Sequence, residues 1–261
     1  MKRISIIALT IILLLTGCTV GETGMNSAKQ DYSFENSDVI AYVDGEPVSE
    51  VPMNNYIVMK KAYMKALADS LDEYTVTEEL MFTEKMLYRW NVERTSDIKQ
   101  YSEKDWVKDY YKSIFLGQRF DESDMYTEEQ LEYDVNSRVN DILESQKKNN
   151  DGLSGLADAG LYVEEINAGV DEAVAVQAAA DEIGITFEEC LNTVYKPFLI
   201  SDYKYAMLLN TFYDELDYGK KVEYADANES EYVDFVIDTM RLNRDYLNSL
   251  FERAEVVERP A

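Results

Sequence analysis

Two side chains that enzymes often use for catalysis are scarce in this sequence, since histidine is missing and cysteine occurs only twice. The absence of histidine excludes Ser-His-Asp and Cys-His catalysis, histidine zinc sites and imidazole proton shuttles. The two cysteines are Cys18 and Cys190. Cys190 follows Glu188 and Glu189, whose negative charges would raise the pKa of its thiol instead of activating it. We therefore interpret Cys190 as a buried structural thiol and not as a nucleophile.

Carboxylates are abundant, but their spacing does not indicate an active site. Glycosidase-like catalysis needs two carboxylates that face each other across a cleft, and neighbours in sequence do not provide this. Adjacent pairs occur at Glu128/Glu129, Glu164/Glu165 and Glu188/Glu189. Residues 226–230 offer oxygen ligands but lack the glycine and the final glutamate of a calcium loop. We expect no catalytic residue, metal site or cofactor, and interpret these carboxylates as helix caps and solvated faces.

The other cysteine, Cys18, follows a short hydrophobic segment. Two basic residues precede an almost purely apolar run at residues 4–15, which is too short for a comfortable membrane span. Leu-Thr-Gly-Cys follows at residues 15–18, and the whole segment resembles a bacterial lipoprotein signal. The resemblance implies cleavage before Cys18, acylation of Cys18 and attachment to the outer face of the cell membrane. A plain secretory signal or an uncleaved anchor is the alternative. An acylated Cys18 would leave Cys190 without a disulfide partner.

The charge of the chain restricts its partners. It contains 51 acidic and 25 basic residues, for a formal net charge of −26. Residues 1–17 include basic but no acidic residues, so removal of the signal would leave the protein still more acidic. Such a charge repels nucleic acid and anionic lipid head groups. We therefore expect no nucleic-acid partner, and contact with the membrane only through the lipid on Cys18.

Local patterns indicate where the folded body begins and ends. Residues 18–37 are polar and aperiodic, which predicts a flexible tether. Val39–Val43 is a β-type run followed by an Asp-Gly turn, with Ser49 as the expected cap of the first helix. Residues 254–258 form a second β-type run. Because two separate strands leave backbone groups unpaired, we expect them to pair with each other beneath a cover of helices.

Between these strands the sequence predicts helices almost throughout. Capping boxes at Ser102, Thr127 and Thr186 begin three of them. Gly184 should end an alanine-rich helix at residues 162–183, and Pro197 should kink or split the helix after it. The remaining expected helices are residues 76–93, with Leu80, Leu87 and Trp90 inward, and a last long helix capped by Asn228 or Ser230.

Apolar stripes on two helices predict the sides that face the core. Residues at positions i and i+3 or i+4 share one face of a helix. The stripe after Thr127 is Leu131, Val135, Val139 and Ile142, and the stripe on the last helix is Tyr232, Phe235, Val236, Met240, Asn243, Tyr246, Leu247 and Leu250. The fold class is therefore mainly α, with a short two-stranded pairing of the N- and C-terminal strands. Residues 149–160 are rich in Gly, Asn and Asp and either separate two lobes or join two antiparallel helices.

Three segments carry a family resemblance. They are the strand and turn at residues 39–49, the helix junction Ala-Asp-Glu-Ile-Gly-Ile-Thr-Phe-Glu-Glu at residues 180–189, and the long helix and strand at residues 235–258. Together they resemble the chaperone lobe of SurA-type periplasmic chaperones and PrsA-type foldase lipoproteins. The resemblance implies a helical body at residues 38–258 that binds unfolded or extended segments of exported polypeptides.

The chain also departs from that family. Members with prolyl isomerase activity carry a parvulin domain with histidines and glycine-rich strands, whereas this chain has no histidine and only 11 glycines. We therefore expect a binding protein and not an enzyme. The alternative is a non-catalytic ligand-binding or assembly lipoprotein that keeps the fold without the chaperone role.

Aromatic side chains are the candidates for a peptide-binding groove. The residues predicted to line it are Tyr56, Tyr63, Trp90, Trp106 and Tyr110. Each of them also lies on a helical apolar stripe, so packing in the core is the alternative for every one.

Overall fold

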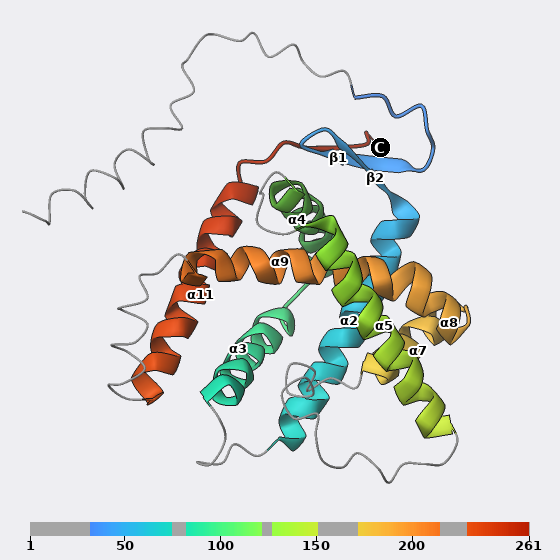
Figure 1. Ribbon diagram of the computed structural model, residues 1–261. Coiled ribbons are helices and arrows are strands. Elements are labelled where there is room, and N and C mark those ends of the chain that lie inside the picture. Colours follow the sequence, from blue (N-terminus) through green and yellow to red (C-terminus); the bar gives the residue numbers. More distant parts are fainter. Residues whose placement is uncertain (1–31, 75–81, 122–126, 151–171, 215–228, 261) are drawn as a thin grey trace, which may run out of the picture. The chain divides into compact units, whose positions relative to one another are not determined.

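The computed structural model describes residues 32–74, 82–121, 127–150, 172–214 and 229–260 (Figure 1). The chain divides into two compact units, Met1–Ser33 and Phe34–Ala261, and the second carries the elements described below. They are β1 (Val39–Val43), β2 (Glu46–Ser49), α2 (Glu50–Glu73), α3 (Phe82–Ile98), α4 (Glu103–Asp121), α5 (Glu128–Asn150), α7 (Glu172–Ile183), α8 (Phe187–Cys190), the π-helical η1 (Leu191–Tyr195), α9 (Lys196–Asp214), α11 (Glu229–Phe251) and β3 (Val256–Glu258). The fold is mainly helical with a small antiparallel sheet, which confirms the predicted fold class. No helix in these described ranges is long and apolar enough to cross a membrane.

The sheet joins the two ends of this unit. Its order is β2-β1-β3, and β1 pairs antiparallel with β3, with Val43 opposite Val256. The predicted pairing of the terminal strands is therefore confirmed. The sheet also contains β2, which forms a hairpin with β1 and which the sequence analysis did not predict. Asp44 and Gly45 both have positive φ, as the tight turn of a two-residue hairpin requires.

Arg259 forms hydrogen bonds with residues 34–37, which precede β1. Its backbone N–H donates to the carbonyl of Ile40 at 2.8 Å. Its guanidinium donates to the carbonyls of Phe34, Asn36 and Ser37. Four residues of the predicted tether, 34–37, thus belong to the second compact unit.

Helix α2 follows the hairpin directly and forms the centre of the core. It packs against α3, α4, α7, η1 and α9, and it buries a face that includes Tyr56, Met59, Tyr63 and Leu67. Ser49 occupies the N-cap position, but its side chain makes no capping hydrogen bond. The predicted cap is therefore correct in position and wrong in chemistry, because β2 runs straight into the helix.

The capping boxes predicted at Ser102, Thr127 and Thr186 each begin a helix, although at Ser102 only the bonds to the Asp105 side chain form. The backbone N–H and hydroxyl of Ser102 both donate to Asp105, and the Thr127 hydroxyl accepts from the backbone of Gln130 at 3.2 Å. The Thr186 hydroxyl likewise accepts from the backbone N–H of Glu189 at 3.2 Å. After α7, Gly184 takes a φ of +82° and ends the helix. Leu131, Val135, Val139 and Ile142 of α5 are all buried.

The helix that contains Pro197 is irregular, as predicted. The irregularity is a π-helical segment in the turn before the proline, and not a kink at the proline itself. Segment η1, with wider π-helical turns, lies between α8 and α9 and ends two residues before Pro197. A proline has no N–H to donate to the preceding turn, and an inserted π turn is one way to accommodate this. The side chains of Asn192 and Thr193 donate to the carbonyls of Glu188 and Glu189, each at 2.8 Å.

Helix α11 corrects one predicted stripe. Tyr246 was predicted to face the core but is 59% exposed, whereas Val233, Ile237 and Phe251 are buried. The inward stripe steps by three and four residues through the buried Val236, the partly buried Met240, and the buried Asn243 and Leu247, and position 246 is about 100° away from Leu247. Ser230 lies inside α11 and is therefore not its cap. Residues 149 and 150 of the expected linker belong to α5, and the predictions for residues 151–160, Leu80, Asn228 and Cys18 concern residues outside the described part of the chain.

Candidate functional site

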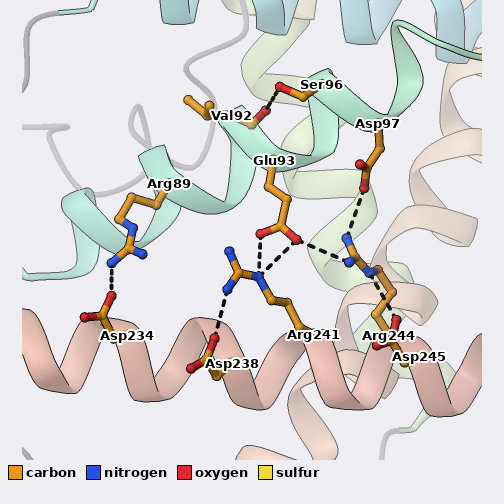
Figure 2. Close-up of polar contacts among 10 residues, drawn as sticks. All are labelled: Arg89, Val92, Glu93, Ser96, Asp97, Asp234, Asp238, Arg241, Arg244 and Asp245. Carbon is orange, nitrogen blue, oxygen red and sulfur yellow. Dashed lines mark hydrogen bonds and ion pairs between the residues drawn. The ribbon is translucent and has the colours of Figure 1, made fainter.

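A row of ion pairs joins α3 to α11 beside the candidate site (Figure 2). The row comprises Arg89, Glu93 and Asp97 from α3 and Asp234, Arg241 and Arg244 from α11. The guanidinium of Arg241 donates to both carboxylate oxygens of Glu93, at 2.8 and 3.1 Å. Arg244 lies 3.2 Å from Glu93 and 3.2 Å from Asp97. Asp97 and Arg244 extend the row to the edge of a cavity.

This polar cavity has a volume of about 260 Å³ and lies among α2, α3, α4, α9 and α11. Its charged lining residues are Lys60, Arg94, Asp97, Asp109, Lys112, Asp202, Arg244 and Asp245. Four of them are basic, a high local share in a chain with twice as many acidic as basic residues. The cavity can therefore accept a negatively charged group, which the acidic outer surface of this protein would repel.

The deepest charges of the polar cavity form a pair between α2 and α4. The Lys60 ammonium lies 2.7 Å from Asp109, and their side chains are only 10% and 15% exposed. Tyr56 donates to Asp109 at 3.2 Å and accepts from Lys60 at 3.0 Å. Burial would raise the pKa of Asp109, but the charge and hydrogen bond of Lys60 outweigh it and hold that pKa below its ordinary value. Burial disfavours the Lys60 ammonium, yet Tyr56 and Asp109 raise its pKa, so both partners are charged at neutral pH.

Two further cationic side chains line the same cavity, and each has N–H donors that no described residue accepts. Arg94 has five N–H donors and makes one hydrogen bond among the described residues, to Asp202 at 3.5 Å. Lys112 donates to the side-chain oxygen of Asn248 at 2.5 Å and lies over the ring of Tyr205, 5.1 Å from its centroid. Burial lowers the pKa of Lys112 to about 8. The free donors of Arg94 and Lys112 are therefore available to a ligand in the cavity.

A second hollow, the apolar groove, lies on the other side of Tyr56. It has a volume of about 550 Å³ and is bounded by β2, α2, α4, η1 and α9. Its apolar lining residues include Pro52, Tyr110, Ile114, Val194, Pro197 and Phe198. Tyr56, Ser113 and Ser201 line both hollows, so the groove and the polar cavity are neighbours.

All five aromatic residues predicted to bind peptide are buried, which favours the alternative of core packing. Their exposed fractions are 9% for Tyr56, 8% for Tyr63, 5% for Trp90, 7% for Trp106 and 8% for Tyr110. Three of them nevertheless border a hollow, because Tyr56 and Trp90 line the polar cavity and Tyr56 and Tyr110 line the apolar groove. The ring of Tyr56 lies 5.1 Å from Tyr110 and 5.7 Å from Phe198. Their peptide-binding role stays a prediction.

Sequence reasoning missed the charged residues of the polar cavity. One signal was present, since Lys60 lies four residues after Tyr56 and so falls on the buried face of α2. A charge on an apolar stripe indicates a buried partner. No comparable signal identified Arg94 or Lys112, because the cavity that they line is assembled from five separate helices.

The remaining candidates have structural roles or lie outside the described residues. Cys190 is buried as predicted, and burial, instead of the charge of its acidic neighbours, raises the pKa of its thiol to about 11. Glu128, Glu129, Glu188 and Glu189 are exposed in the first turns of their helices. Within the described ranges no group of three acidic or cysteine side chains is placed to hold a metal ion.

Comparison with known proteins gave no match, whether to family models, to curated proteins or to solved structures.

Proposed function

We propose that this protein is a lipid-anchored lipoprotein on the outer face of the bacterial cell membrane, and that its helical body binds segments of exported polypeptides. The proposed anchor is a lipid on Cys18, and the proposed role is chaperone-like binding without prolyl isomerase activity. The observation that supports polypeptide binding is the apolar groove of about 550 Å³ between α2, α4 and α9.

The groove suits an unfolded segment because it combines apolar walls with free polar groups. Ile114, Val194 and Phe198 offer surface on which apolar side chains can be buried. Asn55 and Ser201 also line the groove, and the side chain of neither makes a hydrogen bond with another described residue. An extended polypeptide presents apolar side chains and unpaired backbone groups together, and can satisfy both kinds of surface.

The charge of the protein favours a polypeptide partner over the membrane surface. An excess of acidic side chains attracts basic segments, does not repel neutral ones, and repels anionic lipid head groups. A lipid at Cys18 would then hold the body near the membrane while its surface stays free of the head groups.

An aggregation assay with a groove variant tests this proposal. The full-length protein in non-ionic detergent should suppress aggregation of a reduced, unfolded exported protein. Ile114→Glu places a charge on the apolar wall and should remove most of that suppression. The matched control is Leu242→Glu, which adds the same charge at an apolar side chain that is 64% exposed on α11 and should leave suppression unchanged.

The result of the aggregation assay distinguishes a chaperone-like role from the ligand-binding or assembly alternative. Equal suppression by the wild type and Ile114→Glu would show that the groove is not the binding surface. A wild type that folds but does not suppress aggregation would contradict the chaperone-like role and favour the ligand-binding or assembly alternative.

A further inference from the structure

The ion pairing around the polar cavity leaves one cation without a carboxylate. The four aspartates that line the cavity each lie within 4 Å of a basic group: Asp97 and Asp245 near Arg244, Asp109 near Lys60 and Asp202 near Arg94. Lys112 has no such partner among the described residues, although it lines the same cavity. In a protein this acidic, a partly buried ammonium without a carboxylate within 4 Å is a candidate site for an anion.

Arg94 provides the second half of that site. Its single hydrogen bond to Asp202 is long, at 3.5 Å, and leaves most of its N–H donors unused within the described part of the chain. A planar guanidinium fork matches a carboxylate, which can accept two parallel hydrogen bonds from it. The ammonium of Lys112, which lines the same cavity, would supply a third donor to that group.

The remaining residues that line the cavity indicate which chemical group the bound carboxylate should carry. Trp90, Ile98, Tyr101 and Leu116 line it with aromatic and aliphatic surface. A volume of about 260 Å³ holds a small organic group but not a folded domain.

We propose that the polar cavity binds a carboxylate that carries a short apolar or aromatic group, held by Arg94 and Lys112. The same chemistry is offered by the C-terminus of a polypeptide and by a free organic acid. This proposal does not depend on polypeptide binding in the apolar groove, since it uses a different cavity.

The affinity for the carboxylate should fall as the pH rises through about 8. Burial lowers the pKa of Lys112 to about 8, with Asp109 opposing this and Lys60, Arg244 and Lys108 adding to it. Only the protonated amine attracts a carboxylate, so binding is strong below that pKa and weak above it. Tyr205, which faces Lys112 from α9, has a pKa raised to about 12 by burial and stays neutral over this range.

Isothermal titration of the full-length protein, purified in non-ionic detergent, tests the proposal with three probes. They are phenylacetate, an N-acetylated tripeptide ending in phenylalanine with a free carboxyl terminus, and the same tripeptide as its C-terminal amide. We expect saturable binding of at least one carboxylate at pH 7, at least tenfold weaker binding at pH 9.5, and none of the amide. Binding of the peptide alone would identify a polypeptide C-terminus as the ligand, and binding of phenylacetate would identify a free acid.

Substitutions on α4 connect any binding to the cavity. Lys112→Met keeps the length of the side chain and removes the charge, and should weaken carboxylate binding at least tenfold. Lys108→Met is the matched control, because Lys108 lies one turn earlier, is 56% exposed and pairs with Glu252 outside the cavity. It should change affinity less than twofold. Arg94→Lys, which keeps the charge but loses the fork, gives a second test if Lys112→Met does not fold.

Three results would overturn the proposal. They are no binding of either carboxylate up to about 10 mM, equal binding of the amide and the free acid, or unchanged binding by a folded Lys112→Met or Arg94→Lys protein.

Discussion

Replacing Asp109 with alanine should destabilise the protein strongly, because it leaves the ammonium of Lys60 charged and unpaired. The two groups are 2.7 Å apart, and the Lys60 side chain is only 10% exposed. Removing one partner of a buried ion pair costs about 3–5 kcal/mol. The lower end applies here, since the pair borders a cavity and Tyr56 still accepts from Lys60. A loss of about 3 kcal/mol in a folded body of this size lowers the melting temperature by roughly 6–12 °C.

Urea unfolding followed by circular dichroism gives the free energy of unfolding for the wild type, Asp109→Ala and the double variant Lys60→Met/Asp109→Leu. The double variant removes both charges and fills the space with apolar groups, so it should be more stable than Asp109→Ala by at least about 1 kcal/mol. The matched control is Glu252→Ala, which breaks the exposed pair with Lys108 and should cost less than about 1 kcal/mol.

The pH dependence has a definite sign. Because the pKa of Asp109 is lower in the folded protein than in the unfolded chain, its stabilising contribution is complete above the unfolded value of about 3.9. The contribution is lost as the pH falls through the lower folded value. The difference in stability between wild type and Asp109→Ala should therefore be constant from about pH 5 to 8 and shrink below about pH 4. An Asp109→Ala protein as stable as Glu252→Ala, or a double variant less stable than Asp109→Ala, would refute the reasoning.

Three further predictions concern the anchor, the sheet and the absence of catalysis. Cys18→Ala should move the protein from the membrane fraction to the soluble fraction on cell fractionation, and a variant that stays membrane-bound would contradict lipidation there. Deleting residues 254–261 removes β3 and the contacts of Arg259 and should lower the free energy of unfolding by on the order of 3 kcal/mol, whereas deleting residues 19–33 should not change it. The purified protein should not accelerate cis–trans isomerisation of a proline peptide, and measurable acceleration would disprove a purely binding role.

Features that depend on a few neighbouring residues could be predicted from the sequence. The Thr127 and Thr186 caps and the Gly184 helix end each need only three to five consecutive residues, and all formed as expected. Pairing of β1 with β3 was also predictable, because each run is short and apolar and the hydrogen bonds of each need a partner.

Features that depend on distant residues were beyond the local patterns. Strand β2 contains Pro47 and an exposed glutamate, so its sequence favours a turn, and only the adjacent β1 makes it a strand. The exposure of Tyr246 depends on which side of α11 meets α3, α4 and α9. The site around Arg94 and Lys112 is the clearest case, because its residues come from separate helices and share no local spacing.

The order of the strands also has a consequence for how the chain folds. A protein is synthesised from its N-terminus, so the β1–β2 hairpin can form before β3, which is the third strand in sequence order, has been made. Until then one edge of β1, including the row from Ala41 to Val43, has no partner. An open strand edge is a template for pairing with other chains, and contacts between distant segments form slowly. The chain is therefore most prone to aggregation in the interval before β3 pairs with β1, and completion of the sheet ends that interval.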